Sequence, residues 1–325
     1  MDEVELGSVT CPSGQLVLVD GGYLGLWSGD RSPDEVGGPG GVAAVDFEVV
    51  GPDADAAARS FDHQSGRRLY DIPEHAAERF AAKFDEHCSA RGLSASPHRF
   101  PRRIPHRERV RHAIAAGDPD FLVTGVPVVP VGGVPTDRAL RVAATRGQWG
   151  WARIRIELGD GEVAERRPLT RIRIDHARFA FADADALGSW VHDDSLDGLA
   201  DVVFWGGDED EVATEFGAGR TGTPGDDAYG WLSLPIREAY RRAVALEERK
   251  RSEPERRFAL DFRPHSHHWQ VMAAVRAADH EAATLAVGGA DVMMAMTSIG
   301  DGFFPVHLDV DATGAPVAVD IAIDH

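Results

Sequence analysis

The second half of the chain alternates apolar with charged side chains, and this pattern constrains the fold more than any other feature. The alternation is clearest over Trp151–Leu158 and Thr170–Ile174, where Ile154 and Ile156 share one face and arginines occupy the other. A β-strand turns successive side chains to opposite faces, so these segments are expected to be half-buried strands of an antiparallel sheet. The glycines of residues 159–161 supply a turn.

The last part of the chain continues this pattern and predicts a meander of short strands. The predicted strands are Trp269–Val275, Thr284–Val287, Val292–Thr297, Phe303–Val310 and Val317–Ile323. The first of them also fits a helix, because Val271, Met272 and Val275 recur at helical spacing.

Two segments show the period of an amphipathic helix instead. Residues 73–91 begin with Pro73, which suits a first helical turn, and stop before Gly92. Residues 235–251 form the second, with a predicted buried stripe. That stripe contains Ile236, Ala239, Tyr240, Ala243 and Val244. The sequence therefore predicts an α+β fold: one compact domain over residues 1–325, rich in antiparallel sheet, with a helical, Arg-rich insertion near 53–118.

Charge limits the partners. The formal net charge is −19, from 53 acidic and 34 basic residues, which disfavours general binding to nucleic acid or to an anionic membrane. The balance suits a basic protein partner and equally suits solubility. The N-terminus is acidic rather than basic-then-apolar, and the apolar run 121–134 is broken by Gly and Pro. A spanning helix needs about 20 apolar residues, so we expect a cytoplasmic protein that does not enter the membrane.

Arginines are concentrated between Arg99 and Arg111. Such a run could bind a phosphate group or an acidic segment. The interpretation we favour is a solvated helix face whose arginines pair with neighbouring acids.

Three histidines within four residues form the main candidate site. His265, His267 and His268 follow Asp261 and Arg263 in the segment DFRPHSHHW. If this segment is a strand, His265 and His267 point to one side and could supply two ligands of a zinc or iron site. One or more of the histidines could equally be a buried, hydrogen-bonded structural residue.

Carboxylates and one more histidine could complete such a site. His307 is a third candidate metal ligand, and Asp261, Asp197 and Asp201 could be ligands or the base that activates a metal-bound water. Arg263 could bind an anionic substrate. The two cysteines, Cys11 and Cys88, lie far apart and do not form a metal-binding pair.

The segment from Asp309 to Asp320 matches the oxygen spacing of a calcium loop, with Asp309, Asp311, Thr313, Asp320 and a glycine at position six. Both flanks have strand character, whereas an EF-hand loop lies between helices. A hairpin turned by residues 312–314 explains the same residues.

Short motifs at both ends and in the middle are similar to a known family. They are Leu6-Gly7 with Pro12-Ser13-Gly14, residues 174–183, and residues 300–306 with 311–314. On these motifs the chain resembles the uncharacterised bacterial family catalogued as domain of unknown function 4241. The resemblance implies a compact β-rich domain with helical additions and brings no established activity.

Two functions fit these observations. The first is a non-catalytic binding or immunity-type protein that holds a basic partner through its acidic surface. The alternative is a metal-dependent hydrolase that uses His265 and His267.

Overall fold

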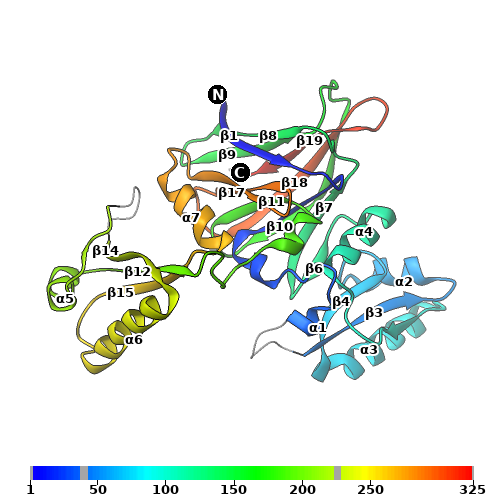
Figure 1. The fold of residues 1–325 in the computed structure, drawn as a ribbon. Coiled ribbons are helices and arrows are strands. Elements are labelled where there is room, and N and C mark those ends of the chain that lie inside the picture. Colours follow the sequence, from blue (N-terminus) through cyan, green and yellow to red (C-terminus); the bar gives the residue numbers. More distant parts are fainter. Residues whose placement is uncertain (1–2, 37–42, 223–227, 324–325) are drawn as a thin grey trace. The chain divides into compact units, whose positions relative to one another are not determined.

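The structure is a computed structural model that describes residues 3–36, 43–222 and 228–323. The chain divides into two compact units, which we call unit 1 (Met1–Trp190 with Ala286–His325) and unit 2 (Val191–Leu285). Figure 1 labels most elements of both. The α+β fold class is confirmed, because the sheets are antiparallel and helices accompany them. The number of domains stays a prediction, since a division into compact units does not show that either one folds alone.

Unit 1 is built on two large antiparallel sheets. The first has the order β1-β8-β9-β19-β18-β10, and the second β16-β17-β11-β2-β7-β6. The strands of the first are β1 (Glu3–Thr10), β8 (Ala139–Arg146), β9 (Trp151–Glu157), β19 (Pro316–Ala322), β18 (Gly302–Val310) and β10 (Glu165–Ile174). Those of the second are β16 (Ala282–Val287), β17 (Ala290–Met296), β11 (Arg178–Asp183), β2 (Gln15–Asp20), β7 (Val126–Gly132) and β6 (Phe121–Val123).

The alternation seen in the sequence explains how these two sheets pack. β1 contacts β17, and β10 contacts β2 and β7, so the sheets face each other. Ile154 and Ile156 are fully buried, and Phe179 of one sheet meets Phe304 of the other with ring centroids 5.3 Å apart. Burial of this apolar face is the main favourable contribution to folding of unit 1.

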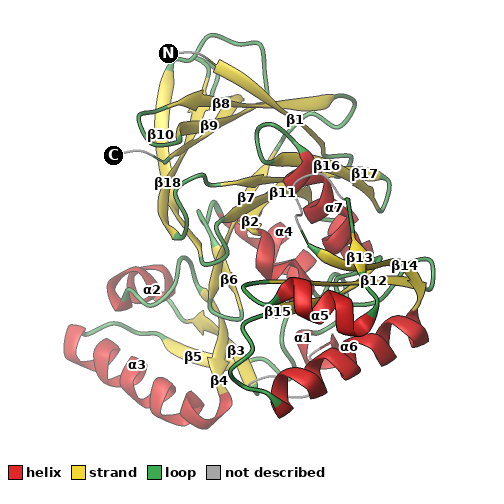
Figure 2. Cartoon of the chain, turned by 90° about the vertical axis from the view of Figure 1, so that its left-hand side faces the viewer, coloured by secondary structure: helices red, strands yellow, loops and turns green. Residues whose placement is uncertain are grey.

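A third, smaller sheet in unit 1 packs against two of its helices. Its order is β4-β3-β5, from β4 (Arg68–Pro73), β3 (Ala44–Val50) and β5 (Ser96–Arg99). The helices α2 (Ala54–Phe61) and α3 (Ala77–Arg91) lie beside this sheet (Figure 2), while α1 (Pro33–Val36) precedes it and α4 (His106–Ala116) follows. The predicted helix 73–91 is confirmed, and it ends at Gly92 with φ 66°, the left-handed conformation that glycine adopts readily.

Unit 2 contains a small sheet with the order β13-β14-β12-β15. In chain order, the strands and helices of unit 2 are β12 (Leu199–Trp205), α5 (Glu209–Phe216), β13 (Gly219–Arg220), β14 (Tyr229–Pro235), α6 (Ile236–Ser252), β15 (Ala259–Pro264) and α7 (His267–Ala277). Helix α6 packs on β12 and β15 through Ala239, Ala243 and Leu246, which confirms the predicted helix 235–251. The predicted buried stripe is wrong at two positions, because Ile236 and Tyr240 are 37% and 63% exposed.

One predicted strand is a helix. The segment Trp269–Val275 belongs to α7, and Ser266 caps that helix by accepting a hydrogen bond from the Trp269 amide at 3.3 Å. Val271, Met272 and Val275 form its buried face. A serine cap satisfies an amide that has no partner within the helix, and this stabilises the helix at the position where β15 has ended. No helix among the described residues is long and apolar enough to cross a membrane.

Candidate functional site

Four of the residues singled out from the sequence line one pocket in unit 2. Asp197, Asp201, Arg263 and His265 surround a hollow of about 320 Å³. Leu232, Trp269, Gln270, Ala273 and Arg276 complete its lining. We call this hollow the unit 2 pocket. The residues of this second set were not predicted from the sequence, although the helical spacing of Trp269, Ala273 and Arg276 marks one face of a helix.

The pairing of β12 with β15 brings two of the four together. Asp201 and Arg263 are directly opposite each other in the antiparallel register. Asp197 lies just before β12, where its Oδ1 accepts hydrogen bonds from the Leu199 amide at 2.9 Å and from the Ser195 hydroxyl at 3.0 Å. Such side-chain-to-backbone bonds hold a turn in one conformation. The position of Asp197 is therefore fixed before any ligand binds.

His265 bridges the two carboxylates. Its Nδ1 lies 2.9 Å from Asp197 Oδ2, and its Nε2 lies 3.1 Å from Asp201 Oδ1. Burial alone would lower the pKa of His265, but the hydrogen bonds to Asp197 and Asp201 and their charges raise it above the ordinary value. The pKa of Asp197 falls to about 2, chiefly through its hydrogen bond to His265. The geometry favours an imidazolium that donates to both carboxylates.

Asp261 acts on Arg263 rather than on the histidines. Its Oδ2 accepts from Arg263 Nη2 at 3.0 Å and from Nε at 3.2 Å. The Arg263 guanidinium also lies 5.3 Å from the centre of the Trp269 ring. Arg263 is 7% exposed, so this pairing offsets much of the cost of burying its charge.

The other predicted ligands are not brought to the pocket wall. His267 is the first residue of α7, and its Nδ1 accepts a hydrogen bond from the Val191 amide at 2.9 Å. The expectation that His265 and His267 share one strand face is therefore wrong, because β15 ends at Pro264. His268 is buried and stacks on His192 at 4.3 Å, while His307 lies in β18 of unit 1. Residues 3–36, 43–222 and 228–323 contain no group of three His, Cys, Asp or Glu side chains placed to hold a metal ion.

The calcium-like segment forms the hairpin between β18 and β19. Asp309 and Asp320 are buried and paired with Arg155, at 2.6 Å and 3.3 Å. The Asp311 side chain is hydrogen-bonded within its own loop, because its Oδ1 accepts hydrogen bonds from the Thr313 and Ala315 amides at 2.8 Å and 3.0 Å. The carboxylates at both ends are thus already neutralised by arginine, and the hairpin interpretation is confirmed.

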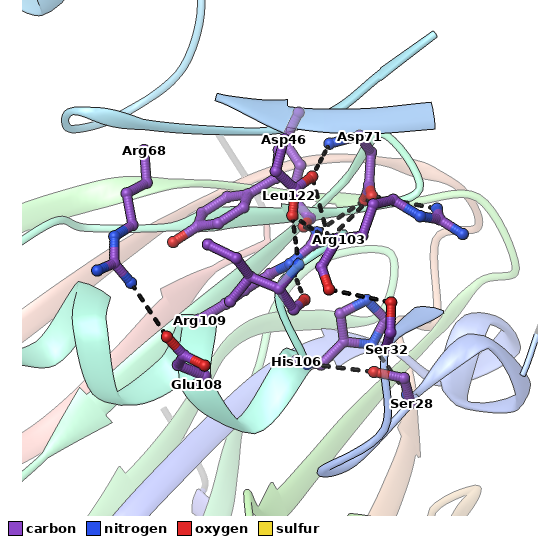
Figure 3. A network of polar contacts seen from close by, with 12 residues as sticks. Ser28, Ser32, Asp46, Arg68, Asp71, Arg103, His106, Glu108, Arg109 and Leu122 are labelled. Carbon is purple, nitrogen blue, oxygen red and sulfur yellow. Dashed lines mark hydrogen bonds and ion pairs between the residues drawn. The ribbon is translucent and has the colours of Figure 1, made fainter. Parts of the chain in front are cut away.

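The arginine-rich run 99–111 is only in part a solvated face. Its pairing with acids is confirmed, but Arg103 is 9% and Arg109 0% exposed, so these two are buried. The Arg109 guanidinium donates to Asp71 at 2.8 Å, to Asp46 at 3.2 Å and to the carbonyl oxygens of Ile104 and Leu122 at 2.9 Å and 2.6 Å. Figure 3 shows this closed network.

The buried carboxylates of that network differ in their pKa. For Asp46, burial dominates and raises the pKa, with the Arg109 charge and two backbone amides acting against it. Burial acts the same way on Asp71, but the hydrogen bond and charge of Arg109 bring its pKa below the ordinary value. Because all three nitrogens of Arg109 donate to internal oxygens, we interpret this network as structural.

Comparison with family models, curated proteins and solved structures found no match for this chain. The resemblance to domain of unknown function 4241 therefore stays a prediction.

Proposed function

We propose that this chain is a non-catalytic binding protein of the immunity type, which holds a basic protein partner through its acidic surface. The observation that carries the proposal is that the carboxylates around the unit 2 pocket are more exposed to solvent than the side chains of Arg263 and His265. The side chains of Asp197 and Asp201 are 49% and 26% exposed, against 9% for Arg263 and 22% for His265. An approaching partner thus meets carboxylate oxygens before it meets the buried guanidinium of Arg263.

Unpaired carboxylates extend this surface. Asp193 and Asp194 precede Asp197 in the same loop, are exposed, and have no ion-pair partner within the described residues. We call Asp193, Asp194 and Asp197 the acidic rim. Elsewhere most described arginines lie within 4.0 Å of a carboxylate, so the excess of negative charge resides on unpaired acids such as Asp193 and Asp194.

Charge at an exposed rim acts mainly on association. Opposite charges steer two proteins together and raise the association rate, and salt screens this attraction over about 10 Å at 0.1 M ionic strength. Contacts at the pocket wall, with Trp269 and Leu232, would then retain the partner.

The alternative, a metal-dependent hydrolase, draws on the convergence of Asp197, Asp201, Arg263 and His265 on one pocket. In this arrangement both ring nitrogens of His265 are already bonded to carboxylates. A metal ion on His265 would have to displace one of them, with loss of a proton from the imidazolium. The binding proposal needs no such rearrangement.

The test uses purified full chain and polylysine as a model basic partner, with polyglutamate as the control polymer. The double substitution Asp193→Lys, Asp194→Lys should weaken polylysine binding by about tenfold and flatten its salt dependence. Glu247→Lys, Glu248→Lys makes the same change of charge on exposed positions of α6 and serves as the matched control. Equal losses in both variants would show that only net charge matters and would contradict a role for the rim.

A further inference from the structure

Unit 1 carries exposed apolar side chains where two turns meet. Trp149 is 78% exposed, Ile299 46% and Phe303 56%. Trp149 lies in the turn between β8 and β9, Ile299 in the turn between β17 and β18, and Phe303 near the start of β18. We call these three residues the aromatic patch. A large aromatic side chain that stays exposed does not gain the free energy of burial, so a group of such side chains is a candidate surface for binding a partner.

The two turns are held together. The Trp151 amide donates to Ser298 Oγ at 2.7 Å, and a Cβ on Gly150 would lie 2.3 Å from that oxygen and 3.4 Å from Ile299 Cγ2. Only glycine permits so close an approach. Thr297 closes the second turn, because its hydroxyl donates to the Gly300 carbonyl at 2.7 Å. The patch is therefore ordered before a partner arrives, which lowers the entropy cost of binding.

Two arginines lie beside the patch. The Arg146 guanidinium lies 5.1 Å from the centre of the Trp151 ring, and Arg171 Nη2 donates to the Phe303 carbonyl at 3.3 Å. Both arginines are exposed, and neither has a carboxylate partner within the described part of the chain.

Two further charged groups lie near the patch: an arginine in an ion pair, and an aspartate that is hydrogen-bonded to a backbone amide and keeps its negative charge. Arg173 lies 6.0 Å from the centre of the Phe303 ring and is paired with Asp175 at 2.8 Å. The Asp301 carboxylate accepts from the Ala177 amide at 2.8 Å. In a chain with net charge −19, Arg146 and Arg171, which have no carboxylate partner among the described residues, thus add two positive charges beside exposed apolar side chains.

We infer that the aromatic patch docks an acidic segment of a partner protein that carries apolar side chains. Tryptophan and arginine are the residue types that most often dominate the energy of protein interfaces. Arg146 and Arg171 can pair with carboxylates, while Trp149, Ile299 and Phe303 cover apolar side chains of the same segment. Nucleic acid fits less well, since it needs many phosphate contacts and the net charge of −19 repels a polyanion. The aromatic patch belongs to unit 1 and the acidic rim to unit 2, so the two proposed surfaces share no residues.

The experiment measures binding of a short fluorescent peptide in which glutamate alternates with leucine and phenylalanine, using purified full chain. Peptides in which lysine replaces glutamate, or serine replaces the apolar residues, are the comparison probes. Trp149→Ala and Arg171→Glu should each weaken binding of the acidic–apolar peptide by at least about tenfold. The controls Val163→Ala, at a site 42% exposed outside the patch, and Arg31→Glu, an exposed arginine without an ion pair, should change it by less than about twofold.

Each other outcome overturns the inference. Absence of binding to wild-type protein, equal binding by Trp149→Ala, or equal binding of the lysine peptide would exclude an acidic segment at this patch. Displacement of the peptide from the patch by a single-stranded oligonucleotide at lower concentration would assign the patch to nucleic acid. Self-association in sedimentation that Trp149→Ala abolishes would assign it to a second copy of the chain. Because Trp149 is 78% exposed, its substitution should leave the unfolding temperature unchanged, and this separates loss of binding from loss of fold.

Discussion

Removing the guanidinium of Arg109 tests whether the buried network of unit 1 stabilises the fold. Arg109→Met keeps an unbranched side chain of similar reach, but leaves the Asp46 and Asp71 carboxylates, 0% and 4% exposed, without their main cation. It also leaves the carbonyl oxygens of Ile104 and Leu122 without this donor. Breaking a buried ion pair from one side costs about 3–5 kcal/mol, because an uncompensated charge remains inside.

Calorimetry can measure this cost. A change of 1 kcal/mol moves the midpoint of a domain of the size of unit 1 by about 2–4 °C, so Arg109→Met should lower the midpoint of the transition in which unit 1 unfolds by about 6–20 °C. The control is Arg102→Met. Arg102 has a side chain that is 72% exposed and lies 4.0 Å from Glu35, so its loss should cost less than about 1 kcal/mol.

A compensating variant distinguishes loss of charge balance from loss of packing. Arg109→Met combined with Asp46→Asn and Asp71→Asn removes the buried negative charges together with the positive one. It should therefore be more stable than Arg109→Met alone. The reasoning is refuted if Arg109→Met costs no more than Arg102→Met, or if the asparagine substitutions add to the loss.

Three further predictions concern pH and backbone. NMR titration should give His265 a pKa above 6.5, and Asp197→Asn should lower that pKa because a hydrogen bond and a negative charge are lost. The stability that His265 contributes is present below pH 6.5 and is lost as the pH rises through the pKa of His265 in the folded state. His106 is 1% exposed and its Nδ1 accepts from the Ser28 amide at 2.9 Å, so burial holds its pKa well below 6.5. The free energy of unfolding, measured in urea, should therefore decrease as the pH is lowered below 6.5, and this pH dependence should be weaker in His106→Gln. Gly230→Ala should destabilise unit 2 by at least about 2 kcal/mol in urea unfolding. A Cβ at Gly230 would lie 2.0 Å from the Val202 carbonyl oxygen, whereas Gly219→Ala, directly opposite it in the sheet, meets nothing within 4 Å and should be tolerated.

The sequence pattern predicted secondary structure correctly where buried and exposed residues alternate regularly along the chain. Alternation over Trp151–Leu158 predicted β9, and helical spacing with a terminal glycine predicted α3. The pattern missed the first half of β10, where residues 165–168 are all exposed at the edge of a sheet and therefore do not alternate. It also missed the start of α7, although Ser266 before an apolar helical stripe is a cap signal that the sequence contains.

The contacts within the candidate site could not be predicted from the spacing of its residues in the sequence. The histidine cluster drew attention to His265, which lines the unit 2 pocket, but its partners Asp197 and Asp201 are 68 and 64 positions away in the sequence. The same limit applies to Arg109, which meets Asp46 and Asp71 across 63 and 38 positions. Residue type indicated which groups could pair. Only the register of β12 with β15, and the packing of α4, decided which groups do pair.

The two charge networks differ in how far their side chains are exposed to solvent, and this difference determines which of them a partner can contact. The Arg109 network is closed, since its carboxylates are buried and every guanidinium nitrogen donates to an internal oxygen. The set formed by Asp197, His265 and Asp201 is equally well hydrogen-bonded, yet Asp197 remains 49% exposed and borders a pocket. A carboxylate that still contacts water can exchange that hydration for a cationic side chain, whereas a buried and satisfied one has nothing to exchange. We therefore propose that a basic partner is recognised at the acidic rim, whereas the buried arginines of the run 99–111 stabilise the fold.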